Sequence, residues 1–222
     1  LERHVDDAFL QQVALAHNNG RRLYIGTVDL DSQRFMVWNM GLIATSGDPD
    51  ALPLFRKVML ASASIPIAFS PVFFDVEVAG HRYDEMHVDG AVAANVFYGG
   101  GLFSSRELRR NAGRESARED VYVIHNGQLA PNVATTGRSL PAIAWRSFQA
   151  AGTSAVVGDL VRIYALSKRE GSDYHWVTIA DDVNLTSNET FDPVAMQQLY
   201  DIGYQAALAG PVWNRSPPGV GS

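Results

Sequence analysis

The feature that most constrains the fold is an alternation between short apolar runs and longer segments with helical spacing. The short runs are rich in β-branched and aromatic residues and are bounded by turn residues, which predicts strands. They cover 22–28, 34–39, 73–78, 81–83, 85–88, 121–124 and 175–179. The longer segments predict helices at 4–18, 52–63, 139–166 and 193–209. No linker divides the chain, so we expect one α/β domain over 1–222 with a Pro/Gly-rich tail at 210–222.

Composition excludes several classes of function. The 222 residues contain no Cys, which removes disulfides, Cys-type zinc sites, iron–sulfur clusters and thiol nucleophiles. The 18 basic and 24 acidic residues give a net charge of −6, so we expect no nucleic-acid partner. The longest uncharged run, 58–74, is interrupted by Pro66 and Pro71 and cannot form a spanning helix, so we expect a soluble chain. Residue 1 is Leu, which suggests processing or a piece of a longer protein.

The densest polar cluster lies at 81–90 and contains several residues of metal-ligating type. Their spacing matches neither a helical His-x-x-x-His pair nor a calcium loop. His87 and Asp89 are two residues apart on a strand and would share a face, so a ligand pair is conceivable there. The six His residues show no pairing pattern, and we therefore expect neither a metal nor a cofactor.

Asp89 has a different potential role, because it follows a short apolar strand and precedes Gly90. A carboxylate at the end of a strand can accept the proton of a serine hydroxyl. The Gly-x-Ser-x-Gly pentapeptide that would present such a serine does not occur in the sequence. Ser62 and Ser64 lie at a predicted helix end beside Pro66, where small polar side chains usually pack or cap. Both serines are weak candidates for a nucleophile, and Ser64 is the better of the two.

Three segments along the chain follow, in order, the motifs of one enzyme family. Gly26-Thr27-Val28-Asp29-Leu30-Asp31 is similar to the strand of the family that ends in Thr-x-Asp-Leu. Residues 60–72 are similar to its Ala-Ser-x-x-x-Pro-x-x-Phe-x-Pro segment, and residues 83–91 to the segment that carries Asp-Gly-Gly or Asp-Gly-Ala. Phe191-Asp192, Gly203 and Trp213 also lie as in the bacterial branch of this family. Over nearly its whole length, the chain therefore resembles the carboxy-terminal half of the bacterial patatin-like phospholipases.

The resemblance implies a three-layer α/β/α sandwich and hydrolysis of acyl esters of lipids by a Ser–Asp dyad without a catalytic His. It assigns the role of base to Asp89 and places Ser62, Ser64 and Gly90 beside the substrate. The serine and the oxyanion loop of the family come earlier than anything in this sequence. We therefore expect the carboxy-terminal portion of such an enzyme, with an incomplete sandwich whose open sheet edge pairs with the upstream fragment or with a second copy.

Three functions remain open at this point. The first is a lipid acyl hydrolase, acting on an acyl ester or a phospholipid, of which this chain carries the aspartate. The second is a catalytically inactive module of the same fold that binds lipid or protein. The third is a small esterase with Ser64 as its nucleophile. Bacterial cytoplasm, periplasm and secretion are all compatible with the sequence.

Overall fold

A computed structural model describes residues 1–98, 104–131, 133–183 and 192–220. The chain forms two compact units, residues 1–95 and 96–222, and each is described by itself. Both combine helices with β-strands, so the predicted α/β class is confirmed. The prediction of one domain over 1–222 stays a prediction, and Phe191 lies outside the described residues.

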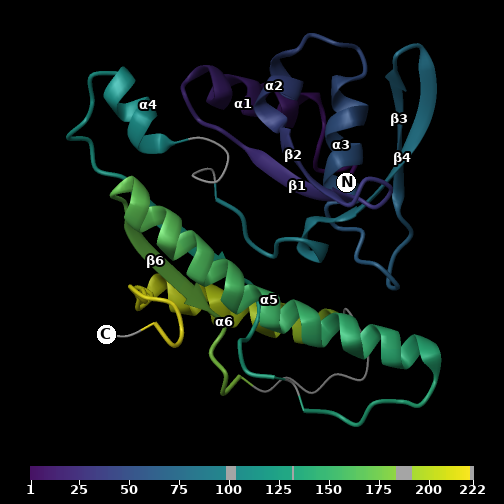
Figure 1. The fold of residues 1–222 in the computed structure, drawn as a ribbon, viewed down its shortest axis with the longest axis vertical. Helices are drawn as coiled ribbons and strands as arrows, with labels where there is room; N and C mark the ends of the chain where they lie inside the picture. The colour runs from purple at the N-terminus through teal and green to yellow at the C-terminus, as the bar shows by residue number, and fades with distance from the viewer. Residues whose placement is uncertain (99–103, 132, 184–191, 221–222) are drawn as a thin grey trace. The chain divides into compact units, whose positions relative to one another are not determined.

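The first unit is built on a four-stranded antiparallel sheet with the order β2-β1-β4-β3. Its elements follow one another along the chain as α1 (Asp7–Asn18), β1 (Tyr24–Asp29), β2 (Arg34–Asn39), α2 (Met40–Thr45), α3 (Ala51–Ala61), β3 (Val72–Val78), β4 (His81–Asp89) and the 3₁₀ turn η1 (Gly90–Val92). Figure 1 shows these elements in purple to blue-green. The two predicted strands at 81–83 and 85–88 are one continuous strand, β4.

The core of the first unit lies between the sheet and its helices. Apolar side chains from α2, α3 and β3 are almost completely buried in it, among them Met40, Phe55, Val58 and Phe74. Burying side chains of this size contributes about 1.5–3 kcal/mol each. The sheet is thereby fixed against the helices, and the ends of β1 and β4 lie beside the segment that follows α3.

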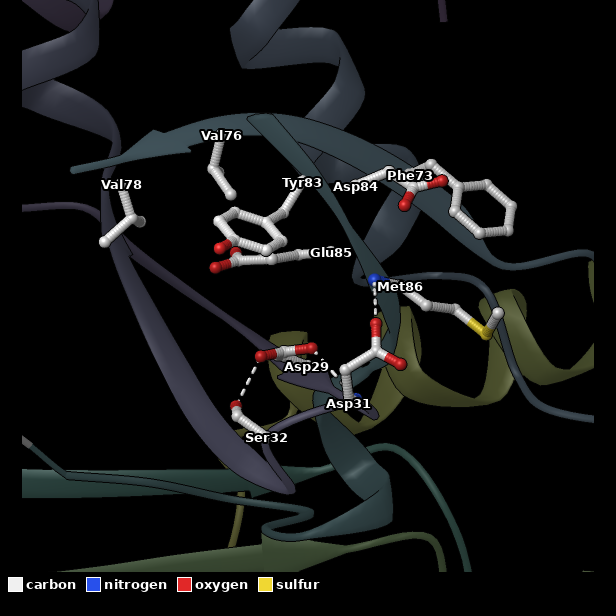
Figure 2. A pocket seen from close by; sticks show the side chains of 10 residues that line it. All are labelled: Asp29, Asp31, Ser32, Phe73, Val76, Val78, Tyr83, Asp84, Glu85 and Met86. Atoms are coloured by element: carbon white, nitrogen blue, oxygen red, sulfur yellow. Dashed lines mark hydrogen bonds between the residues drawn. The ribbon is translucent and has the colours of Figure 1, made fainter. Parts of the chain in front are cut away.

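The turn between β3 and β4 is a tight hairpin, as the sequence predicts. Ala79 and Gly80 both have positive φ, at 53° and 79°, which matches the twist of an antiparallel pair. An open hollow of about 540 Å³ lies beside this hairpin, with side chains from both strands and from the β1–β2 turn around it (Figure 2).

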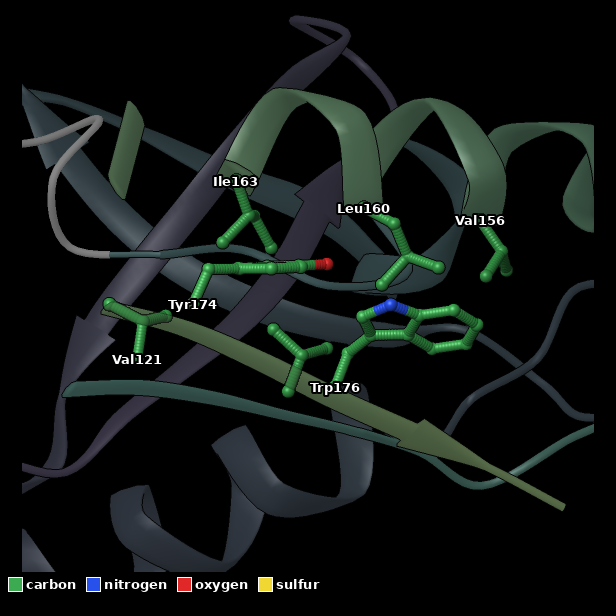
Figure 3. Packing of buried hydrophobic residues seen from close by; sticks show 7 residues of the cluster. Val121, Val156, Leu160, Ile163, Tyr174 and Trp176 are labelled. Carbon is green, nitrogen blue, oxygen red and sulfur yellow. The ribbon is translucent and has the colours of Figure 1, made fainter. Parts of the chain in front are cut away.

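The second unit contains a two-stranded parallel sheet crossed by one long helix. Its elements are α4 (Ser105–Asn111), β5 (Asp120–His125), α5 (Leu140–Glu170), β6 (Asp173–Thr178) and α6 (Pro193–Leu208). Figure 3 shows Val156, Leu160 and Ile163 of α5 packed onto Tyr174 and Trp176 of β6. Helix α5 begins at the Ser139 cap and ends where Gly171 adopts φ 74°.

A buried carboxylate joins α4 to the end of α5. Glu170 is 3% exposed and accepts hydrogen bonds from the Ser104 hydroxyl at 2.7 Å and from the Arg106 backbone N–H at 3.0 Å. These bonds, with that from Arg169, lower the pKa of Glu170 to about 2 although burial opposes ionisation. Within the described parts of the chain, none of the helices has the length and apolarity to cross a membrane.

Candidate active site

The candidate site is built around Asp89, which ends β4. The next residue, Gly90, starts the 3₁₀ turn, and Asp89 caps that turn because its Oδ1 accepts a hydrogen bond from the Ala91 N–H at 2.8 Å. The sequence reading therefore placed Asp89 correctly at a strand end. Among the described residues, the Ala91 N–H is the donor that binds the Asp89 carboxylate. The second carboxylate oxygen, Oδ2, is therefore available to another donor.

The backbone around Asp89 is tied to two other segments. Its N–H donates to the Ser64 carbonyl at 3.0 Å, and in the antiparallel ladder it lies opposite Thr27 of β1. The side chain is half-buried, and this burial raises the pKa of Asp89, while the hydrogen bond from the Ala91 N–H lowers it in part. A carboxylate with a raised pKa is a stronger base and is suited to proton transfer.

Both serines of the segment after α3 donate their hydroxyls to backbone carbonyls. The Ser62 Oγ donates to the Gly26 carbonyl at 2.8 Å, and the Ser64 Oγ donates to the Leu60 carbonyl at 2.8 Å. Ser64 is 2% exposed. The backbone of this segment lies against Asp89, but the two hydroxyls cap and pack. This geometry gives Ser64 no support as a nucleophile.

Gly90 makes a close approach of the η1 turn to β1 possible. A Cβ atom at residue 90 would lie 2.7 Å from the Gly26 carbonyl oxygen and 3.2 Å from the Phe35 ring. Atoms in real structures do not approach so closely, so only glycine fits here without a shift of β1. Gly90 therefore has a structural role, because it allows the turn after Asp89 to lie against β1. Contact of Gly90 with substrate stays a prediction.

A buried polar network lies beside Asp89 that the sequence reading missed. His87 and Thr27 are both 0% exposed, and the Thr27 Oγ1 lies 2.9 Å from the His87 Nδ1. The Trp38 Nε1–H donates to the same Thr27 oxygen at 2.8 Å, and the His87 Nε2 lies 3.3 Å from the Glu85 Oε2. The signal in the sequence was the alternation Glu85-x-His87-x-Asp89, which puts all three side chains on one face of β4.

Four carboxylates lie among the ten residues that line the hollow beside the β3–β4 hairpin. Asp29, Asp31, Asp84 and Glu85 border it, together with the Tyr83 ring (Figure 2). Burial opposes ionisation of Asp29, but hydrogen bonds from the Ser32 hydroxyl and the Asp31 N–H outweigh it and lower the pKa of Asp29. Among the residues that the structure describes, no three His, Asp or Glu side chains form a group that could hold a metal ion.

These features define an α/β protein with a half-buried, basic carboxylate at the end of a strand. The family model of the patatin-like phospholipases matches residues 2–99, so this N-terminal part of the chain is similar to that family. The match includes all three segments at 26–31, 60–72 and 83–91, and it ends before Gly203 and Trp213, whose correspondence stays a prediction. No curated protein and no solved structure matches the chain.

Proposed function

We propose that Asp89 is the general base of a Ser–Asp dyad that hydrolyses acyl esters of lipids. The observation that carries the proposal is the half-buried Asp89 carboxylate, whose pKa is raised by burial and whose second oxygen is available, in a segment that matches the phospholipase family. The match of residues 2–99 to this family supports lipid acyl esters as the substrate class.

The proposed reaction needs a serine that this sequence does not present in a Gly-x-Ser-x-Gly motif. We propose that this serine lies outside the 222 residues. The Asp89 carboxylate accepts the proton of the serine hydroxyl while the serine oxygen attacks the ester carbonyl, and the alcohol leaves with that proton. Asp89 then takes a proton from water while the water oxygen attacks the acyl-serine. The protonated Asp89 passes this proton to the departing serine oxygen, so the fatty acid is released and the serine hydroxyl is restored.

The experiment is hydrolysis of nitrophenyl esters by the native protein, with intact mass spectrometry to show which polypeptides accompany this chain. Asp89→Asn is expected to lower turnover about 10²- to 10⁴-fold, the range typical for removal of a general base. Glu77→Gln, an exposed carboxylate on the neighbouring strand β3, is the matched control and should leave turnover unchanged. Full turnover in Asp89→Asn would refute the proposal. Loss of turnover in Ser64→Ala together with an unchanged fold would favour a nucleophile within the chain.

The edge of β5 supports the proposed partner. Parallel sheets are normally buried on both faces, yet Ile124 of β5 is 73% exposed and Tyr122 is 55% exposed. Among the described strands, β5 pairs with β6 alone. We propose that this edge receives a strand of the serine-bearing fragment or of a second copy. Light scattering should detect the assembly, and Ile124→Lys should abolish it, whereas a monomer before and after the substitution would refute this part.

A further inference from the structure

A continuous chain of hydrogen bonds runs below the strand end that carries Asp89. It passes from the Trp38 Nε1 to the Thr27 Oγ1 at 2.8 Å, then to the His87 Nδ1 at 2.9 Å. It ends where the His87 Nε2 meets the Glu85 carboxylate at 3.3 Å. The chain therefore connects β2, β1 and β4, and its two central members are fully buried.

The directions of these hydrogen bonds follow from the donors present. The Trp38 indole can only donate, so Thr27 accepts from it. The single proton of the Thr27 hydroxyl then needs an acceptor, and the neighbouring His87 Nδ1 is within reach. With Nδ1 as acceptor, the proton of His87 is on Nε2 and is donated to Glu85. This assignment gives each polar atom in this series of hydrogen bonds a partner, as buried polar groups require.

Aromatic rings fix the imidazole from the side. The Phe74 ring centroid lies 4.7 Å from that of His87, and the Trp38 ring centroid lies 5.8 Å from it. Trp38 and Phe74 also stack on each other at 4.9 Å. These ring contacts support the orientation in which the His87 Nδ1 is directed at Thr27.

Thr27 is the residue directly opposite Asp89. The pairing of β1 with β4 is short, since its register runs from Thr27 and Asp89 to Asp29 and His87. The Asp89 N–H is donated to Ser64 and not across the ladder, so Thr27 and Asp89 form the kind of pair whose side chains approach most closely. A displacement of Thr27 would therefore be transmitted directly to Asp89.

We propose that His87 and Thr27 are positioning residues that hold the end of β4, and with it the Asp89 carboxylate, in a fixed place against β1. The inference rests on the proposed function in so far as Asp89 is the base. In this arrangement His87 acts through Thr27 and touches no substrate. His87 keeps the short β1–β4 pairing closed at Asp89, the proposed base.

Hydrogen exchange of the Asp89 backbone amide tests the proposal. Thr27→Val keeps the volume of the side chain and removes the hydroxyl, which leaves the Trp38 N–H and the His87 Nδ1 without their partner. Exchange of the Asp89 amide is expected to accelerate about 5- to 150-fold beyond any change at the Val58 amide of α3, which reports opening of the whole unit. Thr27→Ser keeps the hydroxyl and should restore the slow exchange.

A second readout is the pKa of Asp89, followed by carbon NMR of its carboxyl group. Loosening of the strand end should admit water and bring this pKa down toward its ordinary value in Thr27→Val but not in Thr27→Ser. If Thr27→Val does not fold, Glu85→Ala removes the outer acceptor from a partly exposed position and should selectively accelerate exchange of the Asp89 amide. Exchange alone is the readout for this variant, because loss of the Glu85 charge lowers the Asp89 pKa by itself. Equal acceleration at Asp89 and Val58 with an unchanged Asp89 pKa would overturn the proposal.

These readouts separate the inference from the proposed function. Full ester hydrolysis in Asp89→Asn would remove the catalytic role of Asp89 but would leave the exchange result standing. Conversely, loss of hydrolysis in Asp89→Asn with no selective effect of Thr27→Val would refute the positioning role alone.

Discussion

Gly90 and Gly26 lie in such close contact that a Cβ atom on Gly90 would stand 2.7 Å from the Gly26 carbonyl oxygen. The obstructing atom belongs to the backbone of β1, and the same carbonyl accepts the Ser62 hydroxyl, so it has little freedom to move. This contact fixes where the chain turns directly after Asp89.

Gly90→Ala is expected to destabilise the first unit by about 1–3 kcal/mol, the typical cost of overpacking. Hydrogen exchange of the Val58 amide in α3 measures this free energy. Gly158→Ala is the control, because a Cβ at that position of α5 meets nothing within 4 Å. It should stabilise its own unit by about 0.5–1 kcal/mol. A neutral Gly90→Ala would show that β1 can yield.

Asp89→Asn is expected to raise the free energy of unfolding at pH 7. Burial raises the pKa of Asp89 in the folded state, so the ionised carboxylate costs stability above that pKa. The cost disappears as the pH falls through the raised value, and below the unfolded pKa of about 3.9 the variant and the parent should be equally stable. The side-chain oxygen of Asn can still cap the Ala91 N–H.

Exchange at Val58 measured at pH 7, 5 and 3.5 checks this prediction, with Glu77→Gln as the exposed control. A stability gain at pH 7 combined with loss of hydrolysis would show a residue kept for activity at the expense of stability. A gain that persists unchanged to pH 3.5 would contradict the electrostatic origin.

Glu170→Gln is expected to destabilise the second unit by about 1.5–3 kcal/mol at pH 7, because charged hydrogen bonds to Ser104 and the Arg106 N–H are weakened. The folded pKa of about 2 lies below the ordinary value of 4.5. The contribution of Glu170 is therefore present above pH 4.5 and is lost as the pH falls toward 2.

Urea unfolding followed by the indole NMR signal of Trp176 should show the parent losing stability over that range while the variant changes less. Glu107→Gln is the control, since the Glu107 side chain is 61% exposed and its ion pair with Arg110 is worth little. Parallel pH curves for Glu170→Gln and the parent would contradict the assignment.

Leu160→Ala is expected to cost the second unit about 2–5 kcal/mol. Leu160 is fully buried against Tyr174 and Trp176 (Figure 3), and its removal leaves a cavity that these rings cannot close. Leu140→Ala, at an exposed position on the same helix, should change stability by less than about 0.5 kcal/mol. The same urea experiment measures both, and equal effects would show that α5 does not pack as described.

Most of the elements could be predicted from the sequence because their patterns are local. The hairpin at Ala79-Gly80 follows from two turn residues between apolar runs, and α5 follows from a long helical stripe with Ser139 before it. The six-residue helix α2 was missed, because a helix shorter than two turns shows no periodicity. Only its Asn39 cap, which accepts the Leu42 N–H, marks its start.

The site could be predicted in part for the same reason. Asp89 stands out locally as an Asp-Gly pair at a strand end, so its position and its family motif were readable. For His87 the sequence suggested only a conceivable ligand pair with Asp89, since nothing local to His87 indicates Thr27 as its partner. The two residues are 60 positions apart and meet only because β1 and β4 pair in one register.

The sequence by itself determined most of the strands and the longer helices, the place of Asp89 at the end of a strand, and the match of residues 2–99 to the patatin-like phospholipases. Only the tertiary structure decided that the Ser64 hydroxyl donates to a helix carbonyl, that Gly90 lies in close contact with Gly26, and that the His87 imidazole meets the Thr27 hydroxyl. The physical reason is that propensity and turn chemistry act over a few residues. Burial, close approach and the pairing of donors with acceptors depend on which distant segments the packed sheet brings together.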